Sequence, residues 1–372
     1  MQVVHLPHRF GYQLRRSLGF AGMLLTAMAA SPVHAHDTSD SASQGTNPSQ
    51  LAVQVNDDRM TLSVAKVPQV YLYGTIDAGA AQRVQALVQS NKIPQNSDIY
   101  LNSPGGDMAA GMALGRLFRA GKMTTHLGSP RRTARQPIVP KTSQCVDACA
   151  YAYAGGLFRW APTGSDRFGA QAVAGNASAT DATAYLKEMG VDPKVFGNLP
   201  KGEVTWLNSE QMRQDGMSNN GRLTPTAVYG PANGGTSLTL TQLARDGEHR
   251  LVLQCRADGL SITANYAIGA DRARQMVARA THSYFEINDK PAAEDNHANI
   301  STVGSSVVFT QTIPLTQLNQ LPTAYLMAAW LADRGGNVRY GFWMEMDPVR
   351  NELRNFSNGC QQIAKQAVAS KS

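Results

Sequence analysis

The residues best placed to do chemistry form a Gly-Gly turn, Asn-Ser-Pro-Gly-Gly-Asp, at residues 102–107. The turn follows a strand-like segment at 99–101 and precedes a helical pattern of small and apolar residues. Two glycines at such a junction leave backbone N–H groups exposed and allow a bound group to approach closely. Gly105 and Gly106 could therefore form an oxyanion hole, which stabilises the negative charge that develops in acyl transfer. A plain tight turn would use the same residues, so the pair alone does not establish a function.

Alternating strands and helices position this turn. Residues 70–74, 99–101 and 124–127 have the composition of strands. Apolar residues at helical spacing occupy residues 78–90, and a second helical pattern follows Gly106. Strands that alternate with helices predict a parallel α/β core.

A second region has a different pattern. Segments 250–255 and 260–266 flank an Asp-Gly pair, which is a hairpin signal. Residues 338–346 alternate between apolar and polar side chains and predict a strand with one buried face, whereas 318–331 looks helical. We expect a smaller α+β or β-sandwich domain here, with no chemical motif.

Two changes in composition divide the chain. Residues 37–50 contain almost no apolar side chain, and residues 218–237 are rich in Asn, Gly and Pro. The expected parts are a signal peptide (1–35), a flexible leader (36–66), the α/β domain (67–217), a linker (218–237) and the C-terminal domain (238–372).

The first 35 residues have the pattern of a secretory signal. Arg9, Arg15 and Arg16 precede an apolar stretch at 18–30 and a small-x-small cleavage pattern that ends at Ala35. The stretch is too short to span a membrane, and the paired arginines resemble a twin-arginine signal only weakly. No later run reaches the roughly 18 apolar residues of a spanning helix. We expect a periplasmic or secreted protein with no membrane span in the mature chain.

In an exported chain, the four cysteines would be exposed to an oxidising environment. Cys145, Cys149, Cys255 and Cys360 allow three pairings. Their positions favour two local disulfides, Cys145–Cys149 and Cys255–Cys360. A tetrahedral zinc site is the alternative, but it lacks nearby His or Cys residues at ligand spacing, so no metal is expected.

The charge balance argues against a nucleic-acid partner. The first 35 residues hold three of the 34 basic residues and none of the 27 acidic ones, which leaves the mature chain at +4, with 31 basic against 27 acidic residues. So small an excess, without a Lys/Arg-rich run or a nucleic-acid motif, does not predict DNA or RNA binding.

Four motifs in a fixed order cover about residues 68–217. They are residues 100–107 (YLNSPGGD), 145–156 (CVDACAYAYAGG), 167–171 (RFGAQ) and 206–217 (WLNSEQMRQDGM). In this order they resemble the oxyanion segment, the nucleophile helix, the histidine-bearing strand and a later helix of the Clp protease proteolytic subunit and its relatives in the crotonase-like superfamily. The second motif resembles a Cys-x-Ser-x-Cys helix of exported bacterial relatives. The resemblance implies a crotonase-like α/β core.

Two departures from this family affect its catalytic residues. Asp147 stands at the position of the family's nucleophilic serine, and Gln171 stands at the position of its general base. A serine hydrolase needs a hydroxyl that a neighbouring imidazole activates. A carboxylate beside an oxyanion hole repels the developing negative charge, and glutamine does not accept a proton near neutral pH. Ser103 and Ser143 are expected to be structural, and His126 is expected in a core strand.

These departures favour an exported binding or assembly module without catalytic activity. It would bind a peptide or protein ligand, need no cofactor, and could form homo-oligomers as its relatives do. The alternative is an active peptidase or hydrolase that uses a non-standard nucleophile, either a reduced Cys149 thiolate or the Asp147 carboxylate. A third hypothesis, a crotonase-type acyl-thioester enzyme, is disfavoured because coenzyme A is not expected outside the cytoplasm.

Overall fold

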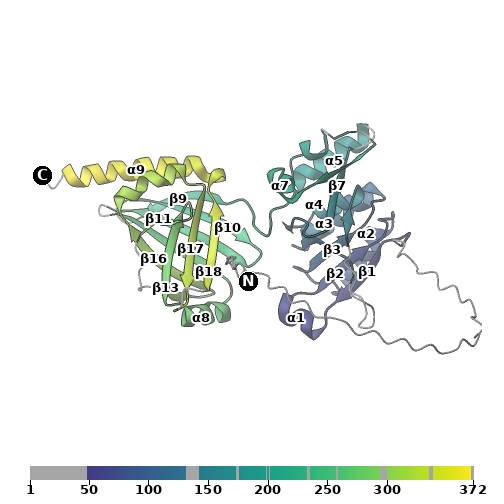
Figure 1. Ribbon diagram of the computed structural model, residues 1–372, viewed down its shortest axis with the longest axis horizontal. Coiled ribbons are helices and arrows are strands. Elements are labelled where there is room, and N and C mark those ends of the chain that lie inside the picture. The colour runs from purple at the N-terminus through teal and green to yellow at the C-terminus, as the bar shows by residue number, and fades with distance from the viewer. Residues whose placement is uncertain are drawn as a thin grey trace, which may run out of the picture. The chain divides into compact units, whose positions relative to one another are not determined.

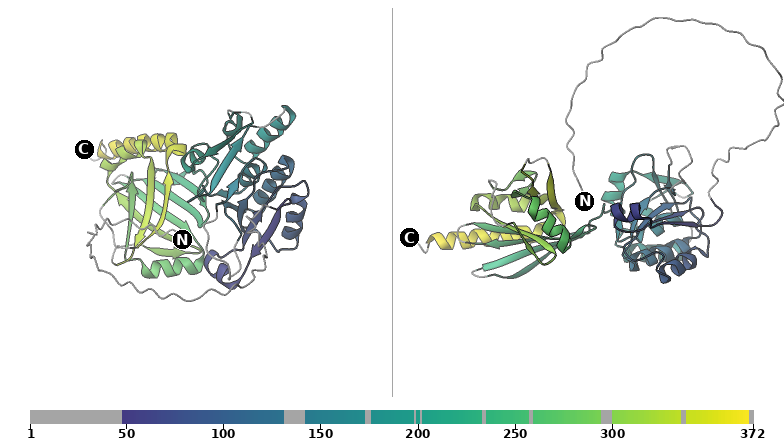
Figure 2. Two further views of the ribbon diagram at one scale, coloured as in Figure 1. Left: turned by 45° about the vertical axis from the view of Figure 1, so that its right-hand side comes forward. Right: turned by 90° about the horizontal axis from the view of Figure 1, so that it is seen from below.

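The computed structural model describes most of the chain after residue 47. The described ranges are 48–130, 142–172, 176–197, 199–200, 202–232, 235–256, 259–293, 300–334 and 338–369. Figures 1 and 2 trace these ranges, with the first helices and strands in purple to teal and the last ones in green to yellow. The predicted signal peptide lies outside the described residues. Within the described ranges, no helix is long and apolar enough to cross a membrane.

The first sheet consists of five strands in the spatial order β1 (Ala52–Asn56), β2 (Gln69–Tyr73), β3 (Asp98–Asn102), β4 (Thr124–Leu127) and β6 (Phe158–Arg159). The last four run parallel, and β1 pairs antiparallel with β2 at the sheet edge. Val70, Leu72, Ile99 and Leu101 are almost completely buried and form part of the core. The predicted parallel α/β core is confirmed.

Helices connect these strands and contribute many residues to the first hydrophobic core (Figure 1). They are α1 (Arg59–Ala65), α2 (Ala80–Gln89), α3 (Met108–Ala120), α4 (Ala148–Ala154), α5 (Asn176–Glu188), α6 (Lys194–Gly197) and α7 (Ser209–Gln214). Every residue of α4 is buried. Glycines on α3 allow this close packing, because a Cβ on Gly111 would lie 2.3 Å from the Ala148 carbonyl oxygen. The small residues of α3 therefore let α4 sit in the interior of the α/β region.

A second, three-stranded sheet continues the α/β region. Its strands are β5 (Gln144–Cys145), β7 (Arg167–Gln171) and β8 (Val204–Leu207). β5 and β7 run parallel, so their carboxyl ends lie at the same edge. A bridge between Ser103 and Cys145 joins the end of β3 to β5. This link brings the Gly-Gly turn to the segment that precedes α4.

Residues 226–369 form a β-rich region with its own hydrophobic core. Its six-stranded sheet has the order β15 (Ser301–Val303), β16 (Ser306–Ile313), β12 (Leu260–Ala267), β11 (Gly247–Cys255), β10 (Gly235–Ala244) and β9 (Thr226–Ala232). Its four-stranded sheet has the order β14 (Lys290–Pro291), β13 (His282–Ile287), β17 (Leu326–Ala332) and β18 (Arg339–Glu345). The remaining elements are α8 (Ala270–Arg279), η1 (Leu315–Thr323), η2 (Asp347–Val349) and α9 (Arg350–Ala369).

Both sheets of this region contribute to a single core. Leu251 and Ile262 of the six-stranded sheet belong to the same buried cluster as Phe285, Leu331 and Phe342 of the four-stranded sheet. All strand pairs in the two sheets are antiparallel. The chain therefore has a mixed α/β fold followed by a sheet-rich region, as expected from its sequence.

Strands begin inside two of the segments that the sequence predicts to be flexible or connecting. The sequence predicts a leader that extends to residue 66, but β1 already pairs with β2, and Val53 and Val55 pack against the core. It predicts a linker over residues 218–237, but β9 and β10 begin inside this range. Asn219 is fixed by hydrogen bonds, since its side chain accepts from the Arg159 backbone N–H and donates to the Leu157 carbonyl. Polar composition marks turns here and not a flexible segment.

The expected helix at 318–331 is wrong. The chain forms the 3-10 helix η1 as far as Thr323 and then the strand β17. Pro322 disfavours a continuous α-helix, and six of the seven residues of β17 are buried between β13 and β18. The hairpin of β11 and β12 is confirmed, as is the strand β18, in which Phe342 and Met344 are buried.

Candidate functional site

The Gly-Gly turn lies between the end of β3 and the start of α3. Gly105 and Gly106 have φ angles of +116° and +139°, which residues with a side chain rarely adopt. A Cβ on Gly106 would also lie 2.2 Å from the carbonyl oxygen of Ile76. Asp107 begins α3, and its side chain accepts a hydrogen bond of 2.8 Å from the Ala110 N–H. The backbone of the turn therefore requires both glycines.

Asp147 lies directly against this turn. Its Oδ2 atom is 3.5 Å from the Gly106 nitrogen and accepts a long hydrogen bond from it. A Cβ on Gly105 would lie 2.9 Å from the Cβ of Asp147. In an acyl-transfer enzyme, donors of this kind hold the oxygen on which negative charge develops. Here a carboxylate of the chain itself accepts from the turn.

The backbone at Asp147 is unusual. Its φ and ψ angles are 53° and −122°, immediately before α4. Such a conformation costs about 1–3 kcal/mol in a non-glycine residue and persists only where the surrounding structure holds it. A strained residue between a strand and a helix is also the geometry of a nucleophile elbow, which presents one side chain at the tip of a sharp turn. The conformation at Asp147 is therefore suited to displaying its side chain beside the turn.

Covalent and hydrogen bonds on both sides hold this conformation. A disulfide joins Cys145 and Cys149, with their Cα atoms 5.2 Å apart. The Ser103 N–H donates to the Gln144 carbonyl at 2.7 Å, and the Val146 N–H donates to the Ser103 carbonyl at 3.3 Å. These bonds fix the segment before α4 to the residues that precede the Gly-Gly turn.

The second predicted disulfide is absent from the described part of the chain. Cys255 and Cys360 are free thiols, both buried in the C-terminal region. They lie within hydrogen-bonding reach of each other, and burial first, then this contact, raises the pKa of Cys360 well above its usual range. A thiol that stays protonated reacts slowly in disulfide exchange. Within the described ranges, no group of three or more His, Cys, Asp or Glu residues could hold a metal ion.

Gln171 is the last residue of β7. Because β7 pairs in parallel with β5, Gln171 and Asp147 follow two neighbouring strands at the same edge of the second sheet. The Gln171 side chain is half-buried. Its amide supplies no proton acceptor comparable to an imidazole.

Tyr151 is a candidate residue that the sequence did not reveal. It lies one helical turn after Asp147 on α4, and its ring stacks on Phe196 at 5.0 Å between centroids. Burial and then the charge of Asp147 raise the pKa of the Tyr151 hydroxyl. Among the described residues, the buried hydroxyl has no hydrogen-bond partner. The four-residue spacing between Asp147 and Tyr151 could have indicated that the two side chains lie close together. The run of apolar neighbours around Tyr151, however, predicts only a core residue.

The other side chains that the sequence analysis considered, those of Ser103, Ser143 and His126, interact with neighbours within the fold. The Ser103 hydroxyl lies 3.2 Å from both the Gly105 nitrogen and the Gly105 carbonyl oxygen, within the turn itself. The Ser143 hydroxyl donates to Asp166. His126 lies on β4, where its ring stacks on Tyr100 at 4.7 Å. Each of these three side chains is thus engaged by neighbours other than Asp147.

Comparisons with known proteins give distant structural neighbours. No family model matches the chain, and no curated protein sequence matches it. The membrane-bound stomatin-specific protease 1510-N, as a substitution variant, is similar at 16% identity and a TM-score of 0.28, over 41% of this chain and 75% of that one. Another variant of it, in complex with a substrate peptide, has the same identity and score, over 39% and 71%.

A hydratase is also similar. It is described as a putative enoyl-CoA hydratase from Streptomyces avermitilis, with 11% identity and a TM-score of 0.28, over 45% of this chain and 66% of that one. Because these sequence identities and TM-scores are low, the proposals below rest on the residues and contacts of this chain alone.

Proposed function

We propose that residues 48–217 are a protease-like module that has lost serine-hydrolase chemistry and acts by binding a peptide or protein ligand. The proposed relationship is to the Clp protease proteolytic subunit. It is supported by the four motifs in order and by the position of Asp147 and Gln171 at the ends of neighbouring strands. In this proposal the protein is exported, which the apolar segment at 18–30 and the Cys145–Cys149 disulfide favour.

The observation that carries the proposal is the contact between Asp147 and Gly106. A hydrolytic serine would leave the turn N–H free for the carbonyl oxygen of a substrate. The Asp147 carboxylate instead lies 3.5 Å from that nitrogen. The Asp147 carboxylate would repel the negative charge that develops in acyl transfer. Residue 171 is a glutamine and therefore supplies no imidazole as a base.

Activity-based labelling tests this proposal. The exported protein is incubated with a fluorophosphonate probe, and labelled peptides are identified by mass spectrometry. We expect no labelled serine between residues 51 and 217 and no cleavage of a mixed peptide library. A specifically labelled serine in this range would overturn the proposal, because it would reveal an activated hydroxyl.

A second candidate function follows from the strained backbone of Asp147. A carboxylate held in the elbow geometry could itself attack the acyl or phosphoryl group of an ester and expel its alcohol as the bond to that oxygen breaks. The anhydride that forms would then be hydrolysed by water, which releases the acid and restores the Asp147 carboxylate. Hydroxylamine would trap such an anhydride as a hydroxamate on Asp147, with a mass change in that one peptide. The thiolate of Cys149 is not a candidate in the bridged protein, because its sulfur is bonded to Cys145 and completely buried.

A further inference from the structure

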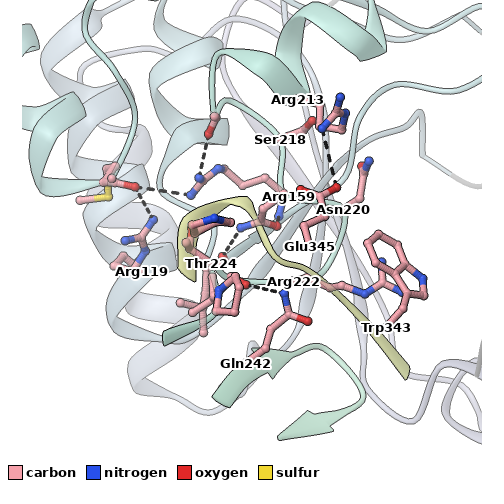
Figure 3. A pocket seen from close by; sticks show the side chains of 18 residues that line it. Arg119, Arg159, Arg213, Ser218, Asn220, Arg222, Thr224, Gln242, Trp343 and Glu345 are labelled. Atoms are coloured by element: carbon pink, nitrogen blue, oxygen red, sulfur yellow. Dashed lines mark hydrogen bonds and ion pairs between the residues drawn. The ribbon is translucent and has the colours of Figure 1, made fainter. Parts of the chain in front are cut away.

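A cavity of about 480 Å³ lies outside the Gly-Gly turn, and neither Gly106 nor Asp147 lines it. Residues of the α/β region, of the segment that follows it and of the β-rich region form its wall (Figure 3). The volume falls within the usual range of small-molecule sites, about 300–1,000 Å³. The cavity is therefore large enough for a small organic ligand.

The wall of this cavity is strongly positive. Arg119, Arg159, Arg213 and Arg222 line it, together with one carboxylate, Glu345. Glu345 lies 3.7 Å from Arg213, and this contact partly neutralises both groups. With four guanidinium groups and one carboxylate among its lining residues, the wall has an excess of positive charge, which favours an anionic ligand.

Arg119 and Arg159 are held in place by backbone carbonyl groups. Arg159 is 5% exposed and donates to the carbonyl oxygens of Gly156, Gly216 and Met217. Arg119 also donates to Gly156. In the part of the chain that the structure describes, neither guanidinium forms an ion pair with a carboxylate. Burial lowers the pKa of Arg159 to about 10, although it remains a cation at neutral pH.

Arg222 supplies the third cation and an aromatic surface. Its guanidinium carbon lies 3.9 Å from the centre of the Trp343 ring, and Figure 3 shows the two side chains together. A guanidinium that stacks on a ring has a fixed plane, which suits it to bind a carboxylate through two parallel hydrogen bonds. Leu157 and Leu223 add apolar surface to the cavity.

Two buried polar atoms on the wall have no partner within the described ranges. They are the Ser218 hydroxyl and the Gln242 Oε1 atom, in residues that are 3% and 4% exposed. The Gln242 amide nitrogen donates to the Leu223 carbonyl, which leaves Oε1 available to accept. An unsatisfied buried polar atom costs about 1–3 kcal/mol. The two atoms would gain partners from a ligand that has both an acceptor and an N–H donor.

We propose that this cavity binds a small organic carboxylate that also carries an amide N–H and an apolar side chain. Its carboxylate would face the arginine cluster and accept from Ser218, and its N–H would donate to Gln242. Its side chain would contact Trp343. An N-acylated amino acid has these groups, and so does the C-terminal residue of a peptide. The proposal does not depend on whether the Asp147 site is inactive.

Calorimetric titration of the exported full-length protein tests the proposal. The ligands are N-acetyl-phenylalanine, its carboxamide, an acetylated tripeptide with a free C-terminus, and inorganic phosphate. We expect N-acetyl-phenylalanine to bind and its carboxamide to bind at least about tenfold more weakly, since a charge-assisted hydrogen bond contributes about 1.5–3 kcal/mol. Tighter binding of the tripeptide would identify a peptide C-terminus as the natural form of the ligand, and tighter binding of N-acetyl-phenylalanine would identify the free acyl amino acid.

Three variants connect binding to the cavity. Arg222→Met keeps an unbranched side chain beside Trp343 but removes the charge, and Ser218→Ala removes only a hydroxyl. We expect at least about tenfold weaker binding for the first and several-fold weaker binding for the second. Arg116→Met is the matched control, because Arg116 pairs with Glu188 at an exposed position outside the cavity. The Arg116→Met variant should bind N-acetyl-phenylalanine with the same affinity as the unmodified protein.

Several results would overturn the inference. Absence of binding at millimolar N-acetyl-phenylalanine would do so, as would equal affinities for the acid and the carboxamide. Binding of phosphate without the organic acids would show a simple anion site instead. Unchanged affinity in both Arg222→Met and Ser218→Ala would place the ligand elsewhere. Because Ser218→Ala removes a single buried atom, it keeps the test decisive if Arg222→Met fails to fold.

Discussion

The Asp147 carboxylate accepts a hydrogen bond from the Gly106 N–H across 3.5 Å, between two segments that are 41 residues apart in the chain. The contact places a carboxylate at a turn whose N–H could otherwise hold an oxyanion. In the proposed function, one residue thus stands in place of a nucleophilic serine and also occupies a donor of the turn, beside the strained backbone and the disulfide.

Restoring both catalytic positions should restore some reactivity. The double variant Asp147→Ser with Gln171→His places a hydroxyl and an imidazole at the ends of neighbouring strands, beside a turn N–H that no longer bonds to a carboxylate. We expect fluorophosphonate to label the introduced serine, even if peptide turnover stays slow. Each single variant should be labelled far less, because nucleophile and base act as a unit.

The control for this experiment is the variant Asp147→Ala with Gln171→His. It frees the turn in the same way but provides no hydroxyl, so any labelling must vanish. Equal labelling of the control and the serine variant would contradict the assignment of residue 147. Labelling of the unmodified protein would do so too.

Local sequence patterns predicted the elements around the site because short-range periodicity determines them. The alternation in β2 and β3 and the spacing of apolar residues in α2 are visible without any tertiary contact. The turn glycines and Asp147 were also predicted to lie together. That prediction depended on the order of motifs, and the Ser103–Cys145 bridge is its physical basis.

Elements that depend on long-range contacts could not be predicted in this way. The segment Leu326–Ala332 has good helix formers, yet it forms β17 because it fills the space between β13 and β18. The strand β1 follows a polar leader and is stabilised by pairing with β2. The arginine-lined cavity combines residues far apart in the chain, from Arg119 to Glu345, and no local pattern brings these together.

Protein produced in an oxidising compartment should contain one disulfide. Cys145 and Cys149 are bonded, whereas Cys255 and Cys360 are buried thiols. We expect intact-mass analysis to show two hydrogens fewer than the fully reduced chain, and native alkylation to leave the two thiols unmodified until the protein unfolds. A loss of four hydrogens would show that the second pair is also bridged.

Breaking the Cys145–Cys149 disulfide should destabilise the α/β region. The bond closes a very short loop, so its loss through Cys145→Ser with Cys149→Ser should cost about 2 kcal/mol of unfolding free energy. Denaturation in urea measures the difference. The matched control is the reduced, unmodified protein, which should be destabilised by a similar amount. A variant as stable as the oxidised protein would show that other contacts alone hold the strained backbone at Asp147.

Gly106 should tolerate no side chain. Its φ is +139°, and a Cβ added there would lie 2.2 Å from the Ile76 carbonyl oxygen, so conformation and space both oppose substitution. The Asp107 N–H donates to that same carbonyl at 2.7 Å, so the carbonyl cannot move without losing a bond. We expect Gly106→Ala to cost about 3 kcal/mol or more in urea denaturation.

Gly164 provides the control for this position. It also has a positive φ, +64°, but nothing lies within 4 Å of the place that a Cβ would take. Gly164→Ala should therefore cost only about 1 kcal/mol, the penalty of the left-handed conformation alone. Equal costs for the two variants would contradict the close packing between the turn and Ile76.

Asp246 should make the stability of the β-rich region depend on pH in acid. Burial of this carboxyl would by itself raise its pKa, but hydrogen bonds from His249 and Tyr266 and the charge of His249 lower it from 3.8 to about 2. The folded state therefore binds its proton less readily than the unfolded state does. The resulting stabilisation, about 2 kcal/mol, is present above pH 3.8 and is lost as the pH falls to about 2.

Comparison of Asp246→Asn with the unmodified protein measures this contribution. At about pH 6 the variant should be less stable in urea by about 2 kcal/mol, and the difference should shrink steadily as the pH falls through the acid range, because protonation removes the same charge. Asp271→Asn is the matched control, since Asp271 lies on the first turn of α8 with its side chain 83% exposed. It should change the free energy of unfolding little at any pH. A difference for Asp246→Asn that stays constant in acid would mean that the carboxyl contributes through packing and not through its charge.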